Sequence, residues 1–292
     1  MTSWIQRIAP VARLAGATLL LTGAMTAAQA QSVLRVAMAP ETTPAEQAAR
    51  FEPLGQFLEA RFKMRVKWVP VASEAFAVRA LLNREADLVW LNGLSYVQAA
   101  IRAKDQVVPL VQREEDQKAR SVFIARAAAA GSIKKLQDLK GRTVSLGPTA
   151  STAENLMPRS ALLAAKLKPE TDLKLTSAAN AEAVVAAVVS GKAEAGALGL
   201  ETWERMVANK QVDPAAVKVV FTTPVYTDHT WAVLADLPEG TRKAIAGGML
   251  VLEAVKGGRD ALKSQRAHRF TETKDAGYAS VRAAAEQTEQ LR

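Results

Sequence analysis

Cysteine is missing from this sequence of 292 residues, histidine occurs only twice, and aromatic residues make up 5% of it. Without cysteine there is no disulfide, so an exported chain of this kind must rely on packing alone. The sequence also lacks a cluster with metal-ligand spacing, a GxSxG motif and a glycine-rich phosphate loop. We therefore expect no metal, no cofactor and no assembled catalytic group, and the sequence favours a binding protein over an enzyme.

The formal net charge is +9, and the basic residues are scattered rather than gathered in one stripe. A nucleic-acid-binding protein shows a basic face with interleaved aromatic residues, so we expect no nucleic-acid partner. The positive charge instead favours solubility and the attraction of anions. At 49% hydrophobic and 23% charged residues the composition is that of a globular protein, and the length suits two domains of about 100–150 residues each.

The first 30 residues predict a cleaved secretory signal peptide. Arg7 and Arg13 precede an apolar run over residues 14–25, and Ala28 and Ala30 supply the small residues that a signal peptidase recognises. The run is too short to span a bilayer comfortably, although an uncleaved membrane anchor is the alternative interpretation. We expect a mature chain that starts near Gln31 and is free in the periplasm, because no cysteine follows for lipid attachment.

Apolar runs and helical spacing alternate along the rest of the chain, which predicts an α/β fold. Strands are predicted over residues 33–39, 64–70, 86–91, 107–112, 121–126, 142–146, 173–176, 193–198, 217–222 and 230–234. Helices are predicted from just after the loop 41–44 to about residue 62, and over residues 74–83, 94–104, 133–139, 152–168, 181–190, 201–209, 239–255, 259–266 and 275–288. Alternation of this kind implies mostly parallel sheets with helices on both faces and ligands at the carboxyl ends of the strands.

The order of these elements predicts two lobes. Residues 31–120 are expected to form the first part of lobe one, residues 121–222 lobe two, and residues 223–292 a strand and helices that return to lobe one. Hinges are expected where the chain crosses, at residues 119–121 and 222–224.

Residues 145–158, SLGPTASTAENLMP, indicate a strand end, a Gly-Pro turn and a helix start. Ser151 is the predicted N-cap of a helix that begins at Thr152, and Glu154 completes a capping box. Hydroxyl groups and free N–H groups at a helix start also favour an anion. A well-capped helix and an anion site are both consistent with this spacing.

Five segments in order resemble the phosphonate-type (PhnD-like) periplasmic substrate-binding proteins of ABC importers. They are LRVAMAPE (residues 34–41) with FEPLGQFLEARF (51–62), ADLVWLNGLSYVQA (86–99), STAENLMP (151–158), GKAEAGALGLETW (191–203) and DAGYASVR (275–282). The resemblance covers most of the chain and implies a two-lobe, type II-like fold that closes by a hinge around a small solute. It further implies a monomer that delivers the solute to an ABC permease in the inner membrane.

The resemblance also implies ligand contacts. Ser151 and Thr152 match the hydroxyl groups that hold phosphonate oxygens, and Ser95 and Tyr96 match a loop of lobe one. Tyr96 is either a pocket wall or a core aromatic residue. Glu201 matches an acidic residue that faces the amine in aminophosphonate binders, or is simply a carboxylate at a helix N-terminus.

The sequence departs from the family at several of these positions. Ala153 and Glu154 replace the third residue of the hydroxyl triplet and a glycine. Glu74 falls at or near the family's pocket tyrosine, and Asn180 lies next to the position of its characteristic histidine. A carboxylate repels an oxyanion, so a cleft-facing Glu74 predicts a ligand that also carries a positive group.

His229 follows Asp228 at the proposed lobe crossing and is a further candidate for the cleft, but no nucleophile accompanies it. An alternative function, a ligand-loaded partner of a membrane sensor kinase, shares every sequence feature with an importer component. A secreted enzyme is the third class considered.

Overall fold

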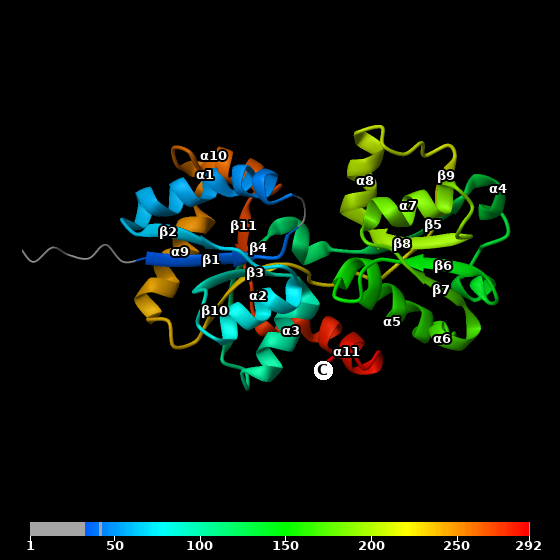
Figure 1. Ribbon diagram of the computed structural model, residues 1–292, viewed down its shortest axis with the longest axis horizontal. Helices are drawn as coiled ribbons and strands as arrows, with labels where there is room; N and C mark the ends of the chain where they lie inside the picture. Colours follow the sequence, from blue (N-terminus) through cyan, green and yellow to red (C-terminus); the bar gives the residue numbers. More distant parts are fainter. Residues whose placement is uncertain (1–32, 41–42, 292) are drawn as a thin grey trace, which may run out of the picture. The chain divides into compact units, whose positions relative to one another are not determined.

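The computed structural model describes residues 33–40 and 43–291 (Figure 1). The predicted signal peptide and the predicted mature start at Gln31 lie outside the described residues. None of the described helices combines the length and the apolar character that crossing a membrane requires.

The first sheet has six strands in the order β11-β4-β10-β3-β1-β2. These are β1 (Val33–Met38), β2 (Arg65–Val69), β3 (Leu88–Leu91), β4 (Val107–Arg113), β10 (Thr230–Leu234) and β11 (Phe270–Glu272). The second sheet has the order β7-β6-β8-β5-β9. Its strands are β5 (Ser121–Arg126), β6 (Thr143–Leu146), β7 (Lys174–Ser177), β8 (Ala195–Gly199) and β9 (Val217–Thr222).

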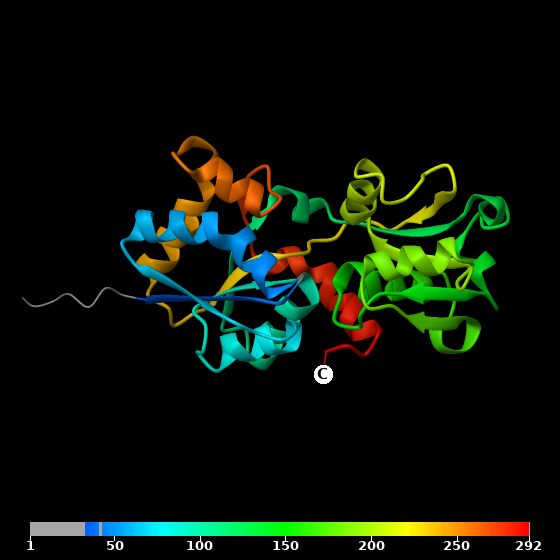
Figure 2. The same ribbon diagram turned by 45° about the horizontal axis from the view of Figure 1, so that its top comes forward.

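Helices flank both sheets, as Figures 1 and 2 show. Those that accompany the first sheet are α1 (Pro44–Phe62), α2 (Glu74–Leu82), α3 (Gly93–Arg102), α9 (Glu239–Leu250), α10 (Gly258–Ser264) and α11 (Ala279–Gln287). Those of the second are α4 (Ala127–Ala130), α5 (Met157–Ala164), α6 (Pro169–Asp172), α7 (Ala181–Val189) and α8 (Leu200–Ala208). Single turns complete the chain: η1 (Glu114–Lys118), η2 (Leu136–Leu139), η3 (Thr152–Leu156), η4 (Leu252–Ala254) and η5 (Asp275–Tyr278).

The predicted α/β class with two sheets is confirmed, but the sheets are mixed rather than mostly parallel. Strand β1 pairs in parallel with β2 and β3, as expected of β-α-β units, whereas β10 runs antiparallel to both β3 and β4. Likewise β5 is antiparallel to β8 and β9. Strands β4 and β5 flank the first crossing between the sheets and β9 and β10 flank the second, so each crossing is bordered by strands that pair antiparallel.

All predicted strands are present, with ends displaced by at most two residues. Strand β11 was not predicted, because three residues are too few to show a period. The helix predicted to reach residue 168 ends at Ala164. The region from 239 to 255 is a helix followed by the single turn η4.

Each sheet is buried between two apolar layers. One face of the first sheet packs on α1, α9 and α10, through side chains such as Phe51, Leu58 and Met249. The other face packs on α2, α3 and α11. This second cluster also contains Leu156 and Met157, which follow the second sheet's strand β6, so apolar contact continues from one sheet's helices to the other's.

The two segments that cross between the sheets are hydrogen bonded to each other. Ser121 N–H donates to Thr223 Oγ1 at 2.8 Å and Thr223 N–H donates to the Ser121 carbonyl at 2.9 Å. Tyr226 N–H donates to the Ala119 carbonyl at 3.0 Å. The predicted lobe limits, at residues 120/121 and 222/223, and the predicted hinges stay predictions. The hydrogen-bonded pairs of the two crossing segments lie at these positions.

Candidate functional site

The turn after β6 places Ser151 at the N-cap of η3, where its Oγ accepts the Glu154 N–H at 3.1 Å. The predicted capping box forms only in this half, because the Ser151 N–H donates to the Pro148 carbonyl instead of the Glu154 carboxylate. The start of the helix at Thr152 is confirmed, although its first turn is a π-helix.

Proline explains the wide first turn. Pro158 has no N–H to donate to the Glu154 carbonyl four residues earlier. That carbonyl accepts instead from the Gly147 N–H at 3.0 Å, so the turn is tied back to the end of β6. Such π-turns frequently occur at functional sites.

A second helix begins opposite this turn. Strand β3 ends at Leu91 and Asn92 caps α3, with its Oδ1 accepting the Ser95 N–H at 2.9 Å. The Asn92 Nδ2 donates to the Ala150 carbonyl at 2.9 Å, which joins the cap to the loop before η3. The N-cap of α3, beside the first sheet, is therefore hydrogen bonded to the loop that precedes η3, beside the second sheet.

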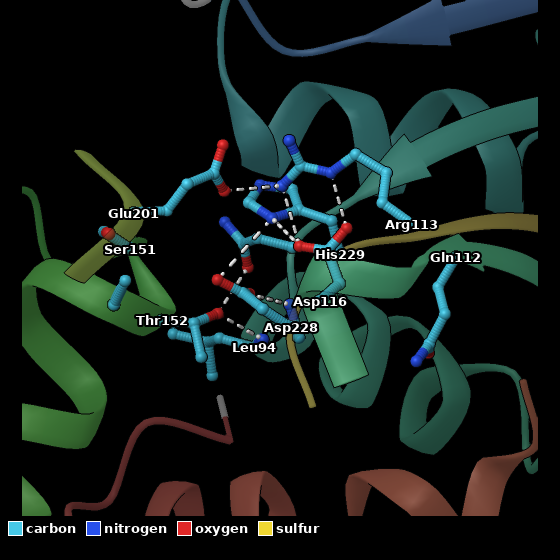
Figure 3. A network of polar contacts seen from close by, with 12 residues as sticks. Leu94, Gln112, Arg113, Asp116, Ser151, Thr152, Glu201, Asp228 and His229 are labelled. Atoms are coloured by element: carbon cyan, nitrogen blue, oxygen red, sulfur yellow. Dashed lines mark hydrogen bonds and ion pairs between the residues drawn. The ribbon is translucent and has the colours of Figure 1, made fainter. Parts of the chain in front are cut away.

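Thr152 makes the central contact between the two sheets (Figure 3). Its Oγ1 accepts the Leu94 N–H at 2.9 Å and donates to Asn92 Oδ1 at 3.1 Å. The residue is 1% exposed. One hydroxyl group of η3 thus occupies an N–H of α3 that the helix itself cannot satisfy.

Asp228 occupies the neighbouring N–H of α3. Gly93 N–H donates to Asp228 Oδ1 at 3.0 Å, and the aspartate is buried. The N–H groups of Gly93, Leu94 and Ser95 therefore all donate to side-chain oxygens. A negative charge at this point is stabilised by the helix dipole.

Arg113, the last residue of β4, connects this region to α8. Its Nε and Nη2 donate to the two carboxylate oxygens of Asp116 at 2.6 and 2.8 Å, and both side chains are buried. Nη2 also lies 3.3 Å from Glu201 Oε2, whose side chain is 45% exposed (Figure 3). Burial raises the pKa of Asp116, but Arg113 and His229 outweigh it and hold the pKa at about 2.

His229 lies between two carboxylates and an indole ring. Its ring stacks on Trp90 with centroids 5.3 Å apart, and its Nδ1 lies 3.4 Å from Asp116 Oδ1 and 3.5 Å from Asp228 Oδ2. Burial lowers the pKa of His229, but the two carboxylates outweigh it and raise the pKa above its usual value, so the ring is an imidazolium at neutral pH.

The predicted site residues fall into two groups. Ser151, Thr152, Glu201 and His229, together with the helix turn that carries Ser95, belong to one connected set of contacts. Through this set two cations, Arg113 and His229, meet three carboxylates, those of Asp116, Asp228 and Glu201.

The remaining predicted residues have other surroundings. Tyr96 is fully buried in the core, its ring 4.3 Å from that of Tyr278 and its hydroxyl donating to Asp275 Oδ1 at 2.8 Å. Asn180 is exposed and caps α7, accepting the Ala183 N–H at 2.9 Å. Glu74 is the half-buried first residue of α2.

The sequence reasoning missed Asn92 and Arg113 entirely. A signal was present for both, since each is a polar residue directly at the carboxyl end of an apolar strand. Asp116 gave no such signal, because its carboxylate meets Arg113, three residues earlier, only through the turn of η1. In residues 33–40 and 43–291, no three histidine, cysteine, aspartate or glutamate side chains are grouped so as to hold a metal ion.

Comparison with known proteins agrees with this architecture. The model of the ABC transporter phosphonate periplasmic substrate-binding protein family matches residues 36–278. The chain therefore belongs to the periplasmic substrate-binding proteins of phosphonate ABC transporters. Membership implies a small-molecule ligand, an ABC permease partner and a periplasmic location, and the family consists of transport proteins rather than enzymes.

Individual relatives are similar over most of the chain. A probable ABC transporter phosphite-binding protein of Prochlorococcus marinus (strain MIT 9301) is 29% identical over 260 residues, 85% of this chain and 87% of the relative. The structure of PhnD1 from Prochlorococcus marinus (MIT 9301) in complex with methylphosphonate aligns with a TM-score of 0.77 and 26% identity, covering 89% of this chain and 99% of that one.

A binding-protein component of a Pseudomonas aeruginosa ABC phosphonate transporter aligns with a TM-score of 0.73 and 16% identity, covering 89% of this chain and 88% of the other. At that identity the likeness shows the fold alone. It is the fold of a two-lobe periplasmic binding protein, which confirms the architecture that the sequence predicted.

Proposed function

We propose that this protein captures a small anionic or zwitterionic solute of the phosphonate type by hinge closure and delivers it to an ABC permease. The observation that carries the proposal is the meeting of two helix N-termini, α3 and η3, at the Leu94 to Thr152 hydrogen bond. Helix N-termini bind oxyanions through their N–H groups and their dipoles. Here one from each sheet reaches the same point.

The anionic group of the solute is placed at the first turn of η3. Ser151 and Thr152 supply hydroxyl donors there, and the α3 turn with Ser95 approaches from the first sheet. In the proposed exchange the oxyanion takes the Leu94 N–H that Thr152 now accepts, and the Thr152 hydroxyl turns from Asn92 Oδ1 to donate to the ligand. His229 supplies positive charge at the edge of the same set of contacts.

The other end of the solute is assigned to acidic side chains. Glu201 keeps 45% of its side chain exposed beside Arg113, so it is accessible to a ligand group. Glu74 is proposed to discriminate the same end. Tyr96 and Asn180 have hydrogen bonds of their own and are proposed to support the site rather than to contact the ligand.

Three finer points belong to the proposal. The chain acts as a monomer, it reaches the periplasm through a cleaved signal peptide over residues 1–30, and it binds stoichiometrically without turnover. The alternative, a ligand-binding partner of a sensor kinase, uses the same site and differs in its docking surface. Neighbouring genes separate the two, since a permease and ATPase favour import and a histidine kinase favours sensing.

A thermal-shift screen of phosphonates, aminophosphonates, phosphite, phosphate, sulfonates and cationic solutes tests the function, followed by calorimetric titration of the best hit. Hydrogen bonds to a charged group contribute about 1.5–3 kcal/mol, so Thr152→Val is expected to weaken binding by about 10- to 100-fold. Thr152→Ser keeps the hydroxyl and is the matched control, with binding expected within about threefold of the parent. Equal binding by Thr152→Val would place the anion elsewhere.

A further inference from the structure

A groove lies between α1 and α10, which pack side by side on one face of the first sheet (Figures 1 and 2). Its volume is about 660 Å³, within the range of about 300–1,000 Å³ that is typical of small-molecule sites. Among the residues that the structure describes, those that line the groove take no part in the contacts around Thr152. The groove is therefore separate from the proposed solute site.

The side of the groove that α1 forms is apolar. Ala49, Pro53, Phe57 and Ala60 line it, and we call these four residues the apolar wall. Their spacing of four, four and three positions places them along one face of the helix. From residue 49 to residue 60 the wall extends for about 16 Å along the helix axis. Ala49 and Ala60 are exposed and small, so the wall has room for an apolar chain.

The charged residues of the groove are mainly basic. Lys256 precedes α10, Lys263 is in its last turn, and Arg50 extends from α1 to its end. Asp260 opposes these three cations and is the only carboxylate among the described residues of the lining. Three positive charges against one negative charge favour an anionic ligand.

Arg50 is a fixed part of this positive charge. Its Nε donates to the Ser264 carbonyl at 2.8 Å, and its guanidinium carbon lies 5.0 Å from the centre of the Phe51 ring. A guanidinium group held in place loses little freedom when it binds an acid group, and its planar geometry suits a carboxylate. The side chains of Lys256 and Lys263 are exposed and have no hydrogen bond or ion pair within residues 33–40 and 43–291, so both can pair with a ligand.

We propose that this groove binds an amphipathic anion, a free solute with one acid group and an apolar chain of medium length. The acid group pairs with the cations at the end of α10, where Arg50 and Lys263 lie, and the chain covers the apolar wall. A recess between two helices holds a single chain, whereas a flat membrane surface would reach only its rim. The site goes beyond the proposed function and does not depend on it.

The test is calorimetric titration of the parent protein with decanoate, hexanoate and decyltrimethylammonium, each below its critical micelle concentration. Decanoate is expected to bind with one-to-one stoichiometry and about tenfold or more tighter than hexanoate, because four further methylene groups lie on the apolar wall. Decyltrimethylammonium has the same chain with the opposite charge and should not bind. Raising the salt concentration from about 0.05 M to about 0.5 M should weaken the binding of decanoate.

Two variants of α1 test the apolar wall. Ala49→Trp fills part of it and should weaken decanoate binding by about tenfold or more. Ala48→Trp places the same side chain at the preceding position, which is exposed and does not line the groove, and should bind decanoate as the parent does. Circular dichroism establishes for each variant that the fold is kept.

A second pair of variants tests the charge and does not depend on the wall substitutions. The double variant Lys256→Gln, Lys263→Gln should weaken decanoate binding by about 3- to 30-fold and reduce its salt dependence. The double variant Lys134→Gln, Lys192→Gln makes the same change in net charge at exposed positions in the loops beside the second sheet, and should match the parent.

Each contrary result overturns the proposal. Decanoate is not held in this groove if it fails to bind the parent, binds no tighter than decyltrimethylammonium, binds Ala49→Trp as tightly as Ala48→Trp, or binds both lysine double variants equally. Vesicles of equal parts phosphatidylglycerol and phosphatidylcholine separate the two sources of an amphipathic anion, and the parent is expected to stay in the supernatant when they are sedimented. Sedimentation of the parent with these vesicles, lost in Ala49→Trp, would overturn the free solute in favour of a lipid headgroup.

Discussion

Residue by residue, the polar contacts between the sheets depend on side chains whose partners lie far away in the sequence. Thr152 was predicted from its place at a helix start, but its bonds to Asn92 and Leu94 span about 60 residues and no local pattern indicates them. Glu154 was predicted as half of a capping box. The structure instead leaves its carboxyl group outside that motif, because Pro148 accepts the Ser151 N–H.

The pKa of Glu154, raised by burial, leads to a prediction about the stability of the protein. Its folded-state pKa of about 7 is above the ordinary value, so the folded protein holds a proton that the unfolded chain releases at lower pH. Stability is therefore lost as the pH rises from about 4.5 to about 7, and Glu154→Gln removes this loss. We expect the variant to be more stable than the parent by about 1–3 kcal/mol at pH 8 and equally stable at pH 4.

Chemical denaturation at pH 4 and pH 8 checks this prediction, with Glu204→Gln as the exposed control. A difference between variant and parent that is the same at both pH values would show that packing, rather than ionisation, is responsible.

At the scale of elements, the sequence was most informative where a single period runs through one segment. Helix α1 and the all-apolar strand β3 were predicted within two residues because their burial follows one repeat. The π-turn of η3 was not predicted, since it depends on Pro158 and on a carbonyl partner at Gly147. The antiparallel placement of β10 was missed because pairing depends on the chain's return and not on its own residues.

Helix α11 contacts helices that belong to both sheets. These are α3, beside the first sheet, and η3 and α5, beside the second. Gln290, just beyond it, accepts from Gln98 Nε2 at 2.7 Å through its carbonyl and donates to Asn155 Oδ1 at 3.1 Å. Gln287 Oε1 accepts from the Ser160 hydroxyl at 2.9 Å. The chain end therefore ties α3 to the helix that carries Ser151 and Thr152.

We predict that the double variant Gln287→Ala, Gln290→Ala releases ligand faster. Two lost hydrogen bonds of about 0.5–1.5 kcal/mol each should raise the dissociation rate by about 5- to 150-fold, with a smaller change in the association rate. Stopped-flow measurement with the best hit of the solute screen gives both rates. Glu286→Ala, exposed on the same helix, is the control, and an unchanged dissociation rate in the double variant would show that these hydrogen bonds do not slow ligand release.

At the scale of the whole molecule, the hydrogen-bonded crossing segments favour a hinge. Rotation about Ala119–Tyr226 and Ser121–Thr223 can separate α3 from η3 without breaking either sheet. We predict that ligand binding makes the protein more compact, because the bound oxyanion would join the first turns of α3 and η3. Small-angle scattering with and without the best hit measures this, and an unchanged radius of gyration at saturation would contradict the hinge.

The position of β10 also has a consequence for the order of folding. This strand lies between β3 and β4, yet it is the last strand but one along the chain and follows every strand of the second sheet. A nascent chain appears N-terminus first, so β3 and β4 keep unpaired edges until β10 has been made at residue 234. Pairing between strands so far apart in the sequence is slow. The first sheet therefore cannot be completed until the chain is nearly finished, although every strand of the second sheet has appeared by residue 222.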